Sequence, residues 1–398
     1  MNTIKNVLPL VFMFMTGCGS ITPTNVADSI ELNLTPTVIK PNDISDTCLQ
    51  EEHIDLGKLD LSGKIFLSQD NKYRVFDVAT DSFVDIPENA HLSPDGEKVA
   101  QYDNDKQGVE VSTLTGNLIS FFPRDAQWFE ANSALYDNTS AVQFDWWNNH
   151  FLYIRSLPVG SQLMLDIETG KTHKIEFPYS KEVWSLGGAM DIRNNYVGFS
   201  PDLDEVIYAS TASHLVLRNN SIYPDGTWRT VTWVGFSSTY SIPRWSPDSS
   251  TFILVIDSSK NTRNIENLFQ VSADSAVGEK QLTDLGSLFN NPYQILINQF
   301  DWSPDGSKVA LTVHIALDEG GKSISRLLVL DVETGNIEDY CNPDPDTPYS
   351  SNGYFSFIWS PDGKYIATDT AIVDLASRVA YKFPDLYIVD WAGEGKNR

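Results

Sequence analysis

The sequence predicts an all-β fold, a β-propeller, from two hairpin signatures that recur along its 398 residues. In the first signature an apolar segment ends in a Ser-Pro-Asp-Gly turn; copies lie at Leu92–Gly96, Phe199–Asp202, Trp245–Asp248, Phe300–Gly306 and Ile358–Gly363. In the second signature an apolar run ends in Glu-Thr-Gly, as in Leu163–Lys171 and Leu328–Asn336. Two hairpins per repeat give four antiparallel strands, which is the pattern of a propeller blade.

The Ser-Pro-Asp-Gly turn follows from the conformational preferences of its residues. Proline fixes φ near the value that the first central position requires, aspartate accepts nearby backbone N–H groups, and glycine adopts the left-handed conformation that ends the turn. The segments after two of the turns, Lys308–Val313 and Lys364–Thr368, have the alternation of a half-buried strand. We therefore interpret the recurring turn carboxylates as structural rather than catalytic: Asp95, Asp202, Asp248, Asp305 and Asp362.

The number of blades depends on degenerate copies. Phe144–Asn149 aligns with Phe300–Asp305, and Val389–Lys396 supplies only the first strand of a blade before the chain ends. Three predicted strands near the N-terminus have no inner strand before them: Lys64–Ser68, Tyr73–Val78 and Phe83–Ile86. We expect a seven-bladed propeller of four-stranded blades, closed by one C-terminal plus three N-terminal strands. Six blades are the alternative, if Trp391 belongs to a tail or an extra edge strand.

These repeats resemble the TolB-like propeller repeats, which also occur in propeller domains of prolyl-oligopeptidase and dipeptidyl-peptidase-type proteins and share the Trp-Ser-Pro-Asp-Gly hallmark. The resemblance covers about residues 60–395 and departs from the pattern at Leu92, Leu203 and Ser249. It implies the fold and says little about activity, because proteins with this repeat include scaffolds, binding proteins and appended domains of enzymes.

The N-terminal segment predicts export. Lys5 precedes the apolar run Val7–Met15, which is too short to span a bilayer as a mature helix, and Thr16-Gly17-Cys18 follows it. The segment resembles a bacterial lipoprotein signal, in which the Cys18 thiol would carry the lipid. We expect residues 1–17 to be a signal peptide, 18–50 a lipid anchor and flexible tether, and 51–398 the propeller domain. The alternative is an ordinary secretory signal, and both alternatives place the mature protein outside the cytoplasm.

Composition limits the partners of the exported chain. The formal net charge is -25, and removal of residues 1–17 would also remove Lys5, which gives -25 minus 1, or -26. Such a body should repel nucleic acid and anionic lipid headgroups. We therefore expect attachment to the cell membrane or outer membrane through acyl chains, and no nucleic-acid partner.

Two cysteines remain besides Cys18. In an oxidising compartment Cys48 and Cys341 could form a disulfide; the alternative is two separate thiols, because sequence separation gives no distance. Their spacing does not indicate a metal site, and we expect no metal and no cofactor.

Binding residues are expected on the long, dissimilar loops between blades and in the middle hairpins, since loops of variable length on a rigid scaffold usually carry function. Those loops are expected at 123–141, 178–195, 218–242, 257–267, 284–298, 314–324 and 342–355. Their aromatic residues suit carbohydrate rings or protein hot spots, although each could instead cover the core between blades. The candidate ligand-binding residues are Trp128, Phe129, Trp184, Tyr223, Trp228, Trp233, Tyr293 and Tyr349.

The sequence contains no serine-hydrolase elbow, zinc-protease motif or nucleotide-binding loop. We therefore expect a non-catalytic, lipid-anchored propeller of the cell envelope that binds a protein or glycan partner through its long-loop face. The alternative is an extracytoplasmic propeller hydrolase or lyase acting on polysaccharide, because the paired carboxylates of such an enzyme need not form a linear motif.

Overall fold

The computed structural model describes sixteen segments of the chain, all within one compact unit, Pro36–Arg398. The described residues are 48–53, 55–69, 72–87, 90–124, 142–156, 162–175, 197–211, 214–219, 228–233, 243–257, 264–273, 280–290, 292–319, 323–343, 356–383 and 386–393.

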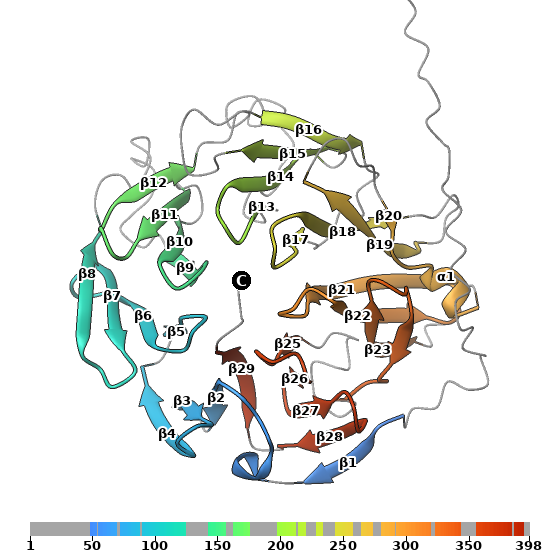
Figure 1. Ribbon diagram of the computed structural model, residues 1–398, viewed down its shortest axis with the longest axis horizontal. Coiled ribbons are helices and arrows are strands. Elements are labelled where there is room, and N and C mark those ends of the chain that lie inside the picture. Colours follow the sequence, from blue (N-terminus) through green and yellow to red (C-terminus); the bar gives the residue numbers. More distant parts are fainter. Residues whose placement is uncertain are drawn as a thin grey trace, which may run out of the picture. The chain divides into compact units, whose positions relative to one another are not determined.

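Their strands form seven sheets around a common centre (Figure 1). Sheet 1 contains β5 (His91–Leu92), β6 (Lys98–Asp103), β7 (Gly108–Thr113) and β8 (Leu118–Pro123). Sheet 2 contains β9 (Val142–Trp146), β10 (Phe151–Ser156), β11 (Gln162–Asp166) and β12 (Thr172–Ile175). Sheet 3 contains β13 (Val197–Phe199), β14 (Glu205–Thr211), β15 (His214–Asn219) and β16 (Trp228–Trp233).

The remaining sheets follow the same order from the centre outwards. Sheet 4 contains β17 (Arg244–Trp245), β18 (Thr251–Asp257), β19 (Glu266–Ser272) and β20 (Lys280–Gln281). Sheet 5 contains β21 (Gln294–Trp302), β22 (Lys308–Ala316), β23 (Ser323–Asp331) and β24 (Ile337–Asp339). Sheet 6 contains β25 (Phe357–Trp359), β26 (Tyr365–Thr368), β27 (Ala371–Asp374), β28 (Val379–Lys382) and β1 (Gln50–His53). Sheet 7 contains β29 (Tyr387–Ala392), β2 (Lys64–Gln69), β3 (Lys72–Asp77) and β4 (Ser82–Ile86).

The predicted all-β propeller of four-stranded antiparallel blades is confirmed. Six of the seven sheets consist of four antiparallel strands and no other, so a count of four-stranded sheets alone gives six blades, the alternative number expected from the sequence. Sheet 6 also has four antiparallel strands, and β1 joins them as a fifth strand that runs parallel to β28. This added strand, which the sequence did not predict, distinguishes sheet 6 from the other six.

Sheet 7 joins the two ends of the described chain, as predicted. The C-terminal strand β29 pairs antiparallel with β2, with Ile65 opposite Trp391 and Ser68 opposite Tyr387. The side chains of Ile65 and Trp391 are fully buried. Ring closure removes two strand edges that would otherwise be exposed.

Tryptophans at the ends of three inner strands join their sheet to the one before it. The indole Nε1–H of Trp146 donates to the His91 carbonyl of sheet 1 at 2.8 Å. Trp302 donates in the same way to Arg244 of sheet 4 at 3.0 Å, and Trp359 to Asp301 of sheet 5 at 3.3 Å. These tryptophans therefore have a structural role, with a hydrogen bond between sheets that the repeat pattern alone did not reveal.

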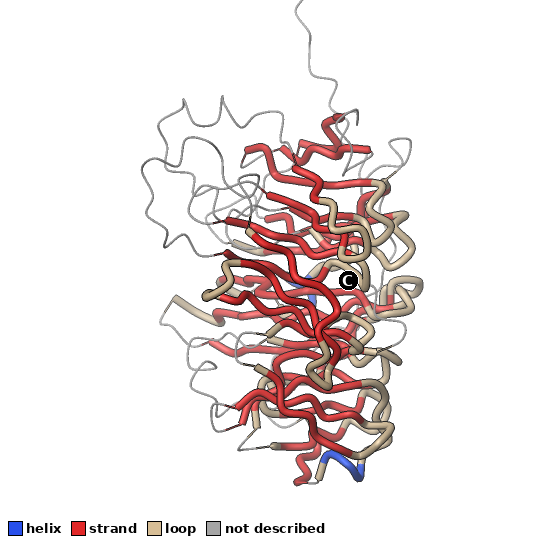
Figure 2. Tube along the Cα trace, turned by 90° about the vertical axis from the view of Figure 1, so that its left-hand side faces the viewer, coloured by secondary structure: helices blue, strands red, loops and turns tan. Residues whose placement is uncertain are grey.

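The antiparallel order places the turns on two faces of the ring. Turns between the first and second strands, and between the third and fourth, lie on one face, which we call the turn face. The other connections lie on the opposite face, the loop face. In the side view many of the described turns follow the right-hand side of the ring (Figure 2).

Helix is scarce among the described residues. They contain the short helix α1 (Leu285–Leu288), capped by the Asp284 side chain, and the 3-10 turn η2 (Leu56–Lys58). Within this described part, neither helix has the length and apolar character needed to cross a membrane.

The segment before sheet 7 is fastened to the outside of sheets 5 and 6. Cys48 and Cys341, the pair that the sequence left open, are joined in a disulfide with Cα atoms 5.8 Å apart. β1 follows, with Gln50 opposite Val379 and His53 opposite Lys382 on β28. We call residues 48–60 the strap. Its strand β1 begins at Gln50, within the segment that the sequence assigned to a flexible tether.

Candidate functional site

Most residues predicted to bind a ligand fall outside the described part of the chain. They are Trp128, Phe129, Trp184, Tyr223 and Tyr349, and the proposed lipidation site Cys18 also lies there. Tyr293 is described: it precedes β21 on the loop face, its side chain is exposed, and its N–H donates to the Ala316 carbonyl at 2.9 Å.

The prediction of a continuous loop over 218–242 was wrong. Trp228 and Trp233 are the first and last residues of β16, the outer strand of sheet 3. The run Trp228–Trp233 is rich in β-branched and aromatic residues, which favour a strand, but its two tryptophans were interpreted as ligand-binding residues of a loop. The expected loop 284–298 likewise contains α1 and the first residues of β21.

The five predicted turn aspartates share one arrangement on the turn face. Each accepts a hydrogen bond from the serine two residues before it, at 2.5 to 2.8 Å, and from the backbone N–H two residues after it. In the turn of sheet 4 the donors to Asp248 are the Ser246 hydroxyl at 2.5 Å and the Ser250 N–H at 3.1 Å. These carboxylates hold their own turns together.

The hydrogen bonds also keep turn carboxylates ionised. The Ser246 hydroxyl, with the Ser250 N–H, lowers the pKa of the Asp248 carboxyl below its usual value. Burial alone would raise the pKa of Asp305, but hydrogen bonds from Ser303 and Ser307 outweigh burial and lower it. A carboxylate held in its ionised form serves as an acceptor and not as a general acid near neutral pH.

Successive turns contact one another around the inner edge of the ring. Hydrogen bonds join Gly393 N to Pro94 O at 2.8 Å, Asp95 N to Asn149 Oδ1 at 2.9 Å, Trp147 Nε1 to Ser200 O at 3.3 Å and Asp202 N to Ser249 Oγ at 3.3 Å. At Gly306 a Cβ would lie 3.4 Å from Pro247, and at Gly363 it would lie 3.7 Å from Pro304. Turns of neighbouring sheets therefore lie against one another along the turn face.

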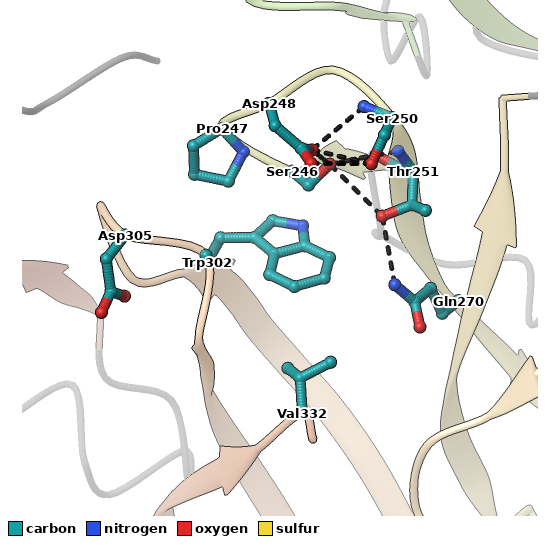
Figure 3. Close-up of a pocket in the computed structure, with 10 residues that line it drawn as sticks. Ser246, Pro247, Asp248, Ser250, Thr251, Gln270, Trp302, Asp305 and Val332 are labelled. Carbon is teal, nitrogen blue, oxygen red and sulfur yellow. Dashed lines mark hydrogen bonds between the residues drawn. The ribbon is translucent and has the colours of Figure 1, made fainter.

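One pocket of about 370 Å³ opens on this face between sheets 4 and 5 (Figure 3). Its volume lies within the range of small-molecule sites, roughly 300–1,000 Å³. Trp302 and Val332 line it from sheet 5, and polar side chains of sheet 4 form the opposite wall (Figure 3). The lining residues are Ser246, Pro247, Asp248, Ser250, Thr251, Gln270, Trp302, Asp305, Gly306 and Val332.

The polar wall is a connected set of hydrogen bonds that points toward Asp248. Gln270 Nε2 donates to Thr251 Oγ1 at 3.1 Å, and the Thr251 hydroxyl donates to Ser246 Oγ at 3.3 Å. Ser246 and Ser250 then both donate to Asp248, the latter at 2.9 Å to each carboxylate oxygen. The lining contains no histidine, lysine or cysteine, and its titratable side chains are the carboxylates of Asp248 and Asp305. The wall can therefore accept hydrogen bonds from a bound donor.

The sequence did not single out Thr251, Gln270 or Trp302 as binding residues. Neither Thr251 nor Gln270 belongs to a linear motif. The signal that identifies them is the register of the strands, which shows which residues occupy the same place in different sheets.

Two histidine–carboxylate pairs also lie among the described residues. His91 Nδ1 is 3.5 Å from Asp145 Oδ1, and His150 Nδ1 is 2.7 Å from Glu168 Oε1. All four side chains are more than a third exposed, and ion pairs in such surroundings contribute little to stability.

Comparisons with known proteins give similarity of fold alone. No protein-family profile matches the chain, and no curated protein sequence matches it. Among solved structures, the β-propeller domain of Myceliophteria thermophila Cps50 (Swd1) is 11% identical, with a TM-score of 0.46, over 83% of this chain and 98% of that one. Oligogalacturonate lyase from Vibrio parahaemolyticus is 13% identical, with a TM-score of 0.45, over 80% and 82%.

Porphyromonas gingivalis dipeptidyl peptidase 4 is 10% identical, with a TM-score of 0.45, over 74% of this chain. The match spans 46% of the peptidase, so less than half of that protein's length has a counterpart here.

Proposed function

We propose that this protein is a non-catalytic, lipid-anchored propeller of the cell envelope that binds a protein or glycan partner through its loop face. The observation that carries the proposal is the use of the recurring aspartates: all five accept hydrogen bonds within their own turns and so serve the scaffold. Lipid attachment at Cys18 is proposed on the N-terminal sequence alone.

The loop face is the better candidate for the partner because the turn face is occupied by short interlocking turns. Tyr293, the described member of the predicted aromatic set on the loop face, has a side chain that water can reach. Exposed tyrosines contribute strongly to binding because they combine apolar area with a hydroxyl group. The acidic chain, at -25, favours a neutral or basic partner.

The test is capture of a partner from detergent-solubilised envelope after chemical crosslinking, with the full-length protein and two variants. Tyr293→Ala should reduce stoichiometric capture at least about fivefold, because truncation of an interface anchor commonly costs more than 1 kcal/mol. Phe83→Ala, at a similarly exposed aromatic residue on the outer strand β4, should leave capture unchanged. Equal capture by all three proteins, or turnover of a polysaccharide by the purified protein, would contradict the proposal and favour the enzymatic alternative.

A further inference from the structure

The pocket between sheets 4 and 5 lies at a place where the repeat is broken by a polar residue. Trp245, at the end of β17, pairs with Phe252 on β18. The next residue of β18, Ile253, pairs with Gln270 on β19. In the other sheets the same register position is apolar: Val75, Val111, Met164, Leu217, Val329 and Ile372. Gln270 is therefore the single polar residue among seven equivalent positions.

Elsewhere this position fills the gap between neighbouring sheets. Val329 packs in one apolar cluster with Trp359 of the next sheet, and Val111 packs with Trp146. The corresponding neighbour of Gln270 is Trp302, and both line the pocket. A polar side chain has thus replaced the apolar contact beneath the pocket.

A second position explains why the pocket is open. Thr251 is the first residue of β18, directly before the partner of Trp245. The equivalent residues in the other sheets are all larger: Lys64, Lys98, Phe151, Glu205, Lys308 and Tyr365. The short threonine leaves room that a long or aromatic side chain occupies elsewhere.

At two of these equivalent positions the protein supplies an ammonium group of its own. Lys98 Nζ lies 3.5 Å from Asp95 Oδ2 and donates at 3.3 Å to the Asn149 carbonyl of the next sheet. Lys64 reaches from sheet 7 to Glu97 of sheet 1. An ammonium ion between sheets, beside a turn carboxylate, is therefore a feature that this ring already contains.

The pocket between sheets 4 and 5 has the acceptors for such a group without the lysine. The hydroxyl protons of Ser246, Ser250 and Thr251 are directed into the network that ends at Asp248. The wall therefore presents acceptors and an ionised carboxylate, and a ligand must bring donors. The opposite wall carries the indole of Trp302, and aromatic rings also attract cations.

We propose that this pocket binds a small organic ammonium ion, with its N–H donors toward Asp248 and its apolar part toward Trp302 and Val332. The ammonium takes the place that Lys98 Nζ fills between sheets 1 and 2. The site lies on the turn face and does not depend on the partner proposed for the loop face.

The probe is n-butylammonium chloride, titrated into the purified protein by calorimetry and followed by protein NMR. We expect binding in about the millimolar range, as is usual for a ligand of so few atoms. n-Butanol has the same shape without the charge and should bind at least about tenfold more weakly, because a charge-assisted hydrogen bond is lost. Equal binding of the two compounds would overturn the proposal. So would the absence of butylammonium binding at about 50 mM, which is about 50 times the expected dissociation constant.

Two variants locate the site. Thr251→Lys introduces the lysine that sheets 1, 5 and 7 carry at the position equivalent to Thr251. It should abolish butylammonium binding, because the chain's own ammonium group then fills the pocket. Gln270→Val introduces the valine that sheets 1, 5 and 7 carry at the position equivalent to Gln270. It should weaken binding while the protein stays folded, as checked by circular dichroism. Thr251→Val, the matched control, keeps the pocket's size and its carboxylate and should retain most of the binding. Unchanged binding in both Thr251→Lys and Gln270→Val would place the ligand elsewhere and refute the assignment.

Discussion

At the residue scale, left-handed backbone conformations decide where each hairpin turns. Gly116, Gly170 and Gly335 end the third-to-fourth-strand turns of their sheets with φ of 81°, 69° and 73°. In sheet 7 the same turn places Asp81 at φ 48°. An L-residue in this conformation is strained by about 1–2 kcal/mol, whereas glycine adopts it freely.

Asp81→Gly should therefore stabilise the protein by about 0.5 kcal/mol, the relief of strain less the entropy that glycine loses on folding. Asp81→Ala keeps the Cβ and removes the short polar side chain that tolerates this conformation, so it should destabilise the protein by a similar amount. Urea denaturation of the three proteins measures both changes. Destabilisation by Asp81→Gly would show that the Asp81 side chain matters more than its backbone conformation.

At the element scale, the Ser-Pro-Asp-Gly hairpins could be predicted because their information is local. Serine, proline, aspartate and glycine each have a fixed task within four consecutive residues, and the inner strands that precede such turns end at the tryptophans of the repeat, such as Trp245 and Trp302. The outer strand β16 was missed because an outer strand has a neighbour on one side only and needs no strong apolar pattern. The pocket was missed for another reason: Thr251 and Gln270 become unusual only when the registers of seven sheets are compared.

The turn carboxylates should also make stability depend on pH. Hydrogen bonds lower the pKa of Asp305 in the folded state, despite its partial burial, relative to the unfolded value of about 3.9. A group with a depressed folded pKa binds fewer protons when folded, so its contribution is present above about pH 4 and is lost as pH falls through the folded pKa.

Asp305→Asn should cost about 1 kcal/mol at pH 7, because the amide oxygen accepts the same hydrogen bonds without the charge. The difference from the unmodified protein should shrink as the pH is lowered toward 2, in urea denaturation at a series of pH values. Asp204→Asn, at an exposed position in the turn of sheet 3, is the control and should change stability little at any pH. A cost for Asp305→Asn that stays constant from pH 7 to pH 2 would show that the charge plays no part.

At the scale of the whole molecule, closure of the ring was predictable and the strap was not. The N-terminal strands lacked an inner strand and the C-terminus supplied one, so the two ends had to meet in sheet 7. The strap depends on contacts between residues 293 positions apart, and nothing in the local sequence gives that distance. The strand β1 is four residues long and exposed throughout, so it has no apolar pattern to predict its pairing.

The disulfide should carry much of the strap's stability, because the pairing of the exposed strand β1 buries little. A crosslink mainly restricts the unfolded chain, and natural disulfides commonly contribute about 2–4 kcal/mol. We expect the double variant Cys48→Ser and Cys341→Ala to lose about that much in urea denaturation, and to be cleaved faster by trypsin after the exposed Lys58. A reducing agent should have the same effect on the unmodified protein and none on the double variant. If reduction leaves both the denaturation midpoint and the cleavage rate of the unmodified protein unchanged, the strap is held by β1 and β28 alone, and the covalent link is dispensable for the ring.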